Sequence, residues 1–172
     1  MDHLKKAQPF IDEARRLGAP DAVAFSIEDI VFDSRSFLKC RFGCPQWGKH
    51  YTCPSGTGIS MEQYREMFGR YQWGLIVRTH DPISAQKITH ALEAMAFCQG
   101  YYWAMSLSDC HLCDPCGAAV NTPCPHPELA RPGFHSIGVD VFATVKKFDL
   151  PLHTLTEEGK ELPNWYAAVF ME

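Results

Sequence analysis

Seven of the eight cysteines are confined to two segments that lack any periodic apolar pattern, residues 39–58 and 109–134. Glycine and proline are frequent in both segments, so each is predicted to be a long irregular loop. Long irregular loops inside a domain usually carry its function. The chain is therefore expected to fold as a regular framework that holds two cysteine-rich loops.

Apolar periodicity outside these loops predicts that framework. Alternating or continuous apolar residues predict strands within residues 21–33, 73–80, 101–107 and 164–172. Helical spacing predicts helices at residues 8–17, 60–69, 81–99 and about 134–147. Alternating strands and helices predict an α/β (α+β) fold, with a single sheet of about four strands covered by helices.

Two helix starts carry specific signals. Ser60 followed by Gln63 is a capping box, in which each residue hydrogen-bonds the backbone of the other. Asp81 followed by Pro82 is a helix-capping residue before a proline at the first helical position. These signals place the helix boundaries more firmly than apolar spacing does.

Length and charge limit the classes of function. A chain of 172 residues buries about 70% of its extended surface on folding. Residues 1–172 can therefore form one cysteine-rich metal-binding domain whose folding does not require a metal ion or a disulfide. A net charge of −4 disfavours a nucleic-acid partner. The apolar runs are too short to cross a membrane, and the charged N-terminal segment is unlike a signal peptide. We therefore expect a cytoplasmic protein, whose cysteines bind metal or act in redox chemistry rather than form disulfides.

The second loop carries the stronger metal signal. Its cysteines are Cys110, Cys113, Cys116 and Cys124. The two-residue gaps resemble the bacterial ferredoxin pattern, in which closely spaced thiolates hold a [4Fe-4S] cluster. Zinc, which favours two separated pairs of cysteines, is the alternative. Because seven residues precede Cys124, this thiolate is expected either to close the local site or to bind across to another.

The first loop offers three thiolates, Cys40, Cys44 and Cys53. A cluster held by three cysteines leaves one iron open to a substrate or a ligand other than cysteine. A fourth thiolate from Cys124 or Cys98 is the alternative, and a zinc site completed by His50 is another. Cys98 follows a regular helical pattern, which favours a buried thiol over a ligand.

These motifs resemble a family of predicted metal-binding proteins, domain of unknown function 2284. The resemblance rests on residues 37–54, 109–117 and 124–141, and the likeness spans residues from about 20 to 150. It implies seven metal-binding cysteines: Cys40, Cys44, Cys53, Cys110, Cys113, Cys116 and Cys124. Ser55 and His135 depart from it, since the family usually has a proline and a glutamate there.

Three functions fit these observations, and no catalytic residue is identified. The first is an iron–sulfur protein with one or two [4Fe-4S] clusters, which transfers electrons with a redox partner protein or delivers a cluster to a partner enzyme. The second is an iron–sulfur enzyme that binds a small molecule at an open iron of the three-cysteine loop. The third is a zinc-stabilised interaction module. Nucleotide-binding fingerprints and paired acid/base carboxylates are missing, which favours the first function.

Overall fold

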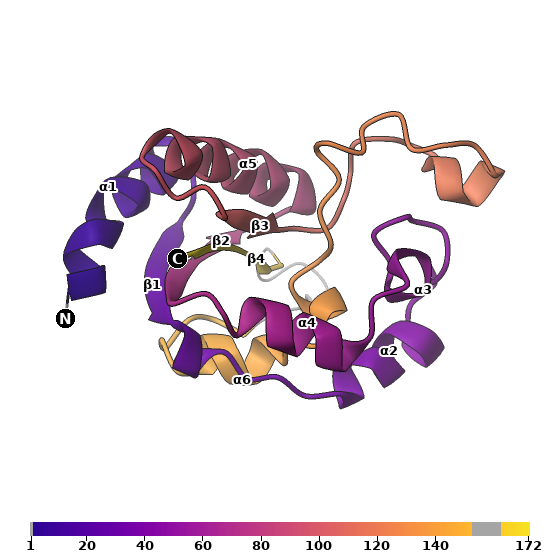
Figure 1. The fold of residues 1–172 in the computed structure, drawn as a ribbon, viewed down its shortest axis with the longest axis horizontal. Helices are drawn as coiled ribbons and strands as arrows, with labels where there is room; N and C mark the ends of the chain where they lie inside the picture. Colours follow the sequence, from indigo (N-terminus) through magenta and orange to yellow (C-terminus); the bar gives the residue numbers. More distant parts are fainter. Residues whose placement is uncertain (1, 153–162) are drawn as a thin grey trace.

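The computed structural model describes residues 2–152 and 163–172, which build a four-stranded sheet with helices on both faces (Figure 1). Its strands are β1 (Asp21–Ser26), β2 (Trp73–Thr79), β3 (Met105–Leu107) and β4 (Trp165–Met171). They lie in the order β1-β2-β4-β3, and every neighbouring pair is antiparallel. The predicted α+β fold with a single sheet is therefore confirmed.

Strand β4 lies between two strands that precede it in the chain. Since β4 is antiparallel to both β2 and β3, those two strands run parallel to each other. Helix α5 (Pro82–Cys98) connects them, which makes a split β-α-β unit with β4 in its gap.

Helices cover both faces of the sheet. Helix α1 (Asp2–Arg16) and α5 pack on one face, where Trp73, Leu75 and Val77 of β2 point. Helices α4 (Met61–Phe68) and α6 (Val141–Lys146) contribute to the core on the other face, with Ile76. Covering both faces explains why β2 is apolar along most of its length rather than alternating.

Both predicted helix starts are confirmed. The Ser60 hydroxyl accepts a hydrogen bond from the Gln63 amide at 3.2 Å, and the Ser60 amide donates to Gln63 Oε1 at 2.8 Å. The Asp81 carboxylate accepts from the Ser84 amide at 2.8 Å, and Pro82 opens α5. These caps fix the elements that flank the cysteine-rich segments.

The prediction of one irregular loop at 39–58 is wrong in part. Helix α2 (Arg35–Gly43) enters it, and the short helix α3 (Pro54–Thr57) lies near its end. Neither helix is longer than nine residues. In the sequence, the surrounding glycines and prolines indicated a loop more strongly than the weak helical pattern indicated these two short helices.

The predicted helix at about 134–147 is interrupted. A 3-10 turn, His135–Ile137, ends at Gly138, whose φ of 95° leaves the helical region. Val139 then pairs with Phe32 in an isolated β-bridge before α6 begins. The four-residue apolar spacing reflects burial of separate elements on one core, not a continuous helix.

Two other predicted boundaries shift. Only the last three residues of the strand predicted at 101–107 pair with β4, and α1 begins at Asp2 rather than near residue 8. In Figure 1 both cysteine-rich segments lie at the right of the molecule, away from α1. No helix among the described residues has the length and apolar character needed to cross a membrane.

Candidate metal centre

Helices α2 and α3 position three thiols, Cys40, Cys44 and Cys53, which we call the first cysteine group. Cys40 lies on α2 and is only 6% exposed, whereas Cys44, the residue that ends α2, is exposed. Cys53 is the residue before α3, and its thiol donates a hydrogen bond to the carbonyl of Gln46 at 3.5 Å. All three thiols therefore lie within or directly beside two short helices.

The thiols of the first cysteine group interact electrostatically. Burial, and after it negative charge at Cys44, Cys53 and Asp109, raises the pKa of the Cys40 thiol to about 11. Cys40, Cys44, Cys53 and Asp109 all line one cavity. Asp109 directly precedes Cys110, so it joins the first group to the second loop.

The remaining four loop cysteines, Cys110, Cys113, Cys116 and Cys124, form the second cysteine group. All four are half-buried. The pKa of the Cys113 thiol is raised by burial and then by negative charge at the other three. Cys124 therefore lies near the other thiols of its own loop.

A glycine permits the turn that returns Cys124 to its neighbours. Gly117 follows Cys116 in a 3-10 turn, Gly117–Val120. A Cβ atom on Gly117 would lie 2.6 Å from the carbonyl oxygen of Thr122 and 2.8 Å from that of Pro123. Only glycine fits this close approach of backbone to backbone.

A hydrogen bond joins the start of the second cysteine group to helix α5. The side-chain oxygen of Gln86, a buried residue of α5, accepts a hydrogen bond from the amide of His111 at 3.1 Å. His111 directly follows Cys110, so the first thiol of the group is tied to a rigid helix.

The two cysteine groups meet at one cavity. The Tyr51 hydroxyl donates a hydrogen bond to the carbonyl of Thr122 at 2.6 Å, which joins the two cysteine-rich segments. A cavity of about 470 Å³ is lined by all three thiols of the first group and by Cys110 of the second. His50 and His111 also line it, and burial together with the charge of His111 lowers the pKa of His50.

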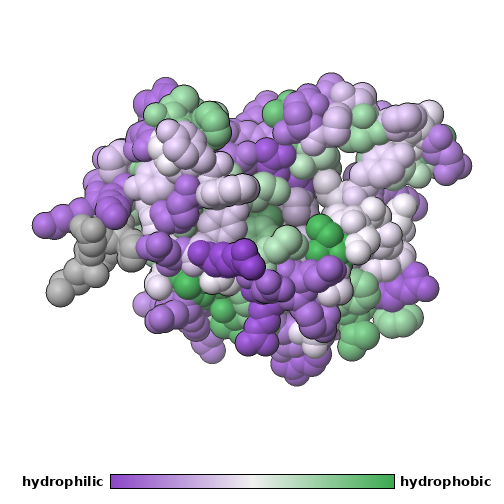
Figure 2. Space-filling view, viewed as in Figure 1, coloured by the Kyte–Doolittle hydropathy of each residue, from purple (hydrophilic) through white to green (hydrophobic). Residues whose placement is uncertain are grey.

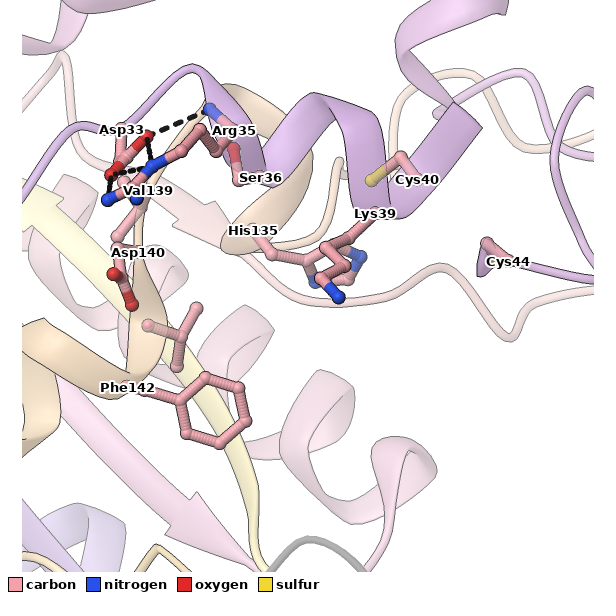
Figure 3. Close-up of a pocket in the computed structure, with 11 residues that line it drawn as sticks. Asp33, Arg35, Ser36, Lys39, Cys40, Cys44, His135, Val139, Asp140 and Phe142 are labelled. Carbon is pink, nitrogen blue, oxygen red and sulfur yellow. Dashed lines mark hydrogen bonds and ion pairs between the residues drawn. The ribbon is translucent and has the colours of Figure 1, made fainter. Parts of the chain in front are cut away.

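A second cavity, of about 600 Å³, adjoins the first cysteine group (Figure 3). Cys40, Cys44 and Lys39 of α2 line it, and His135 and Phe142 line it from other elements. At the end far from Cys44, Figure 3 shows the ion pair between Asp33 and Arg35. Hydrogen bonds from Arg35 lower the pKa of Asp33 to about 2.

His135 takes part in both cavities. It lines each of them, and its Nδ1 atom lies 4.0 Å from the carboxylate of Asp109. The sequence marked His135 only as a departure from a family pattern, and it gave no sign that Asp109 and Cys110 reach the first group. Such contacts depend on tertiary folding, because the loops are far apart in the sequence.

The predicted burial of Cys98 is wrong. Cys98 is exposed at the end of α5, the end that Figure 1 places beside α1 and away from the loops. The buried stripe of α5 ends at Ala96, because the helix runs on past the core. Cys98, one of the two thiols considered as a fourth ligand for the first group, is therefore remote from it.

The donor atoms suit a metal centre built on sulfur. Soft thiolates are the ligands that zinc and iron–sulfur clusters take from proteins. The second group has four thiols, the number that such a cluster takes, and the first group has three. Within residues 2–152 and 163–172, no three Cys, His, Asp or Glu side chains converge closely enough to hold a single metal ion.

The fold and these thiols define a small α+β protein with two cysteine groups at one end of its sheet. A family model described as predicted metal-binding protein (DUF2284) matches residues 24–171, and the chain belongs to that family. No curated protein and no solved structure matches the chain.

Proposed function

We propose that this metal-binding protein is a cytoplasmic iron–sulfur protein with two [4Fe-4S] clusters that transfers electrons with a partner protein. The observation that supports the proposal is the division of seven thiols between two segments that meet, where Cys110 of the group of four lines the same cavity as all three thiols of the group of three. Two redox centres side by side suit the relay of single electrons. Delivery of a cluster to a partner enzyme is the related function that the same centres would serve.

Each cysteine group has its own part. Cys110, Cys113, Cys116 and Cys124 would hold one cluster by four thiolates, the complete set that such clusters take. Cys40, Cys44 and Cys53 would hold the other and leave one position for a different ligand. When bound, the clusters supply reversible one-electron chemistry. The polypeptide supplies the thiolates and fixes their spacing through α2, α3 and Gly117.

The decisive experiment is an analysis of iron, zinc and acid-labile sulfide in protein purified without oxygen, with a visible spectrum of the same sample. We expect about eight iron and eight sulfide per chain and an absorbance that dithionite bleaches reversibly. Zinc without sulfide would overturn the proposal and leave a zinc-stabilised interaction module. About four iron and four sulfide would restrict it to a single cluster.

Single cysteine variants assign the ligands. Cys113→Ser should lose about half of the iron and sulfide, because one of two centres fails, and its far-ultraviolet circular dichroism should stay that of the native framework. Cys98→Ser is the matched control, since Cys98 is a thiol remote from both groups. Unchanged iron in Cys113→Ser, or lost iron in Cys98→Ser, would contradict this assignment.

A second candidate function is an enzyme that binds a small molecule at the first cysteine group. The cavity of about 470 Å³ beside Cys40, Cys44 and Cys53 favours it, because it is large enough for a small ligand. The expected sign is a change in the spectrum when cyanide or a small thiol is added. That change should disappear in Cys44→Ser and persist in Cys113→Ser.

A further inference from the structure

Basic side chains are concentrated around the first cysteine group. Residues 34–61 contain four lysines and arginines and no aspartate or glutamate, whereas the whole chain has a net charge of −4. The rest of the chain therefore carries a net charge of −8. Arg35 is paired with Asp33, but Lys39, Arg41 and Lys49 are exposed. A positive region on an otherwise acidic protein attracts partners of negative charge.

Two large apolar side chains stand out among these charges. Phe42 is 80% exposed and Leu38, one helical turn earlier on α2, is 55% exposed. The Arg41 guanidinium lies 6.0 Å from the Phe42 ring centre. In Figure 2, green apolar side chains lie beside purple polar ones at the lower right, where Figure 1 places α2. We call Leu38, Lys39, Arg41, Phe42 and Lys49 the α2 surface.

The α2 surface is carried largely by the same short helix as the first cysteine group, since Cys40 belongs to α2 and Cys44 ends it. Phe42 stands between Cys40 and Cys44 in the chain, two residues from each. Because side chains two residues apart point to opposite sides of a helix, the exposed Phe42 and the buried Cys40 lie on opposite sides of α2. A protein seated on Phe42 would therefore be separated from Cys40 by the width of one helix, about 10 Å. An apolar centre with a charged rim is typical of protein interfaces, and redox encounters use small ones.

We propose that the α2 surface docks a small electron-carrier protein with an acidic face, and that this carrier exchanges electrons with the first cysteine group. The inference rests on the proposed function. One electron leaves the reduced carrier and one enters the centre held by Cys40, Cys44 and Cys53. No bond forms or breaks in this step, and no proton is needed for its balance.

The test uses the metal-loaded protein and, as probe, a plant-type [2Fe–2S] ferredoxin of net negative charge. Affinity is measured by titration and electron transfer by stopped-flow absorbance. Binding and transfer should both weaken as salt rises, because the attraction is between exposed charges. The triple variant Lys39→Glu/Arg41→Glu/Lys49→Glu should lower the second-order rate by about tenfold or more. Phe42→Ser should weaken binding several-fold, by about the loss of one apolar anchor.

Two matched controls lie elsewhere on the molecule. Lys5→Glu/Arg15→Glu/Lys146→Glu makes the same change of net charge at exposed sites on α1 and α6. Trp103→Ser removes an aromatic side chain that is 77% exposed, beyond the end of α5. Both controls should stay within about twofold of the unaltered protein, since long-range effects of net charge are small beside local ones at physiological salt.

Several outcomes would overturn the proposal. Equal losses of the second-order rate in the two triple variants would mean that the net charge of the protein, not the α2 surface, controls the rate. A protein that dithionite reduces but the ferredoxin does not would lack this partner, and tight binding without electron transfer would remove the redox role. Binding of the α2 surface to phosphatidylserine vesicles, with none to ferredoxin, would assign it to a membrane. Failure of the proposed function is separate, because the iron and sulfide content of the same sample reports it.

Discussion

Arg131 of the second cysteine-rich segment forms a two-point ion pair with Glu93 of α5. The guanidinium Nε and Nη2 atoms lie 3.1 and 2.5 Å from the two carboxylate oxygens, and the Ser106 amide of β3 donates to the same carboxylate at 2.6 Å. Both charged side chains are largely buried, at 16% and 17% exposure. A loop, a helix and a strand are therefore joined at one carboxylate.

Removing the arginine should destabilise the fold strongly. Arg131→Met leaves the Glu93 carboxylate buried without its cation, so we expect a loss of about 3 kcal/mol in the free energy of unfolding, measured in urea. Arg70→Met is the control, because Arg70 pairs with Glu66 at an exposed site and should cost less than about 1 kcal/mol. Equal losses of unfolding free energy in Arg131→Met and Arg70→Met would show that burial of the ion pair does not affect its contribution to stability.

The same carboxylate should make stability depend on pH. Burial alone would raise the pKa of Glu93, but hydrogen bonds from Arg131 and Ser106 outweigh it and hold the pKa below its usual value. The stabilisation is therefore complete above the unfolded pKa of about 4.3 and is lost as the pH falls through the lower folded pKa.

Glu93→Gln tests this dependence. The difference in free energy of unfolding between native protein and variant should be largest near neutral pH and should shrink below about pH 4. Urea unfolding at several pH values measures it, and absorbance of the same samples reports any release of metal. If the difference in free energy of unfolding stays constant across this pH range, the ionised Glu93 carboxylate is not the source of the pH dependence.

Gly117→Ala should disturb the second cysteine group. The added Cβ would meet the carbonyl oxygens of Thr122 and Pro123, so the turn that returns Cys124 must open. We expect about half of the metal to be lost, because one of two centres fails, while the circular dichroism of the framework is kept. Gly43→Ala should retain its metal, since nothing lies within 4 Å of a Cβ there.

The core should be separable from the metal centre. Leu92 of α5 is fully buried against the sheet, so Leu92→Ala should cost about 2–5 kcal/mol in the free energy of unfolding. The metal content of the folded variant should be unchanged. Leu17→Ala, at a more exposed site, should cost less than about 1 kcal/mol. Loss of metal at native-like structure in Leu92→Ala would contradict this separation.

Local chemistry made most of the framework predictable from the sequence. The starts of α4 and α5 follow from hydrogen bonds between residues three positions apart, which a sequence displays directly. Strands β2 and β4 follow from apolar runs. The interruption at Gly138 was not visible, because its cause is tertiary: Val139 pairs with the distant Phe32, and a Cβ on Gly138 would meet Met61.

The candidate site was predictable only as residue types. Cysteine spacing indicated the seven loop thiols and their division into three and four, but where the two loops meet depends on tertiary folding. Neither the pair of Arg131 with Glu93 nor the sharing of a cavity by Cys110 and the first group has a local signal. The exposure of Cys98 likewise depends on where α5 leaves the core.

The position of β4 in the sheet sets an order of events during synthesis on the ribosome. Strands β2 and β3 do not pair with each other, because β4 lies between them, and β4 follows both cysteine-rich segments in the chain. All seven loop thiols are thus translated before the strand that unites the two halves of the sheet exists. A nascent chain that stops short of β4 would carry all seven loop thiols on a sheet still open at its middle.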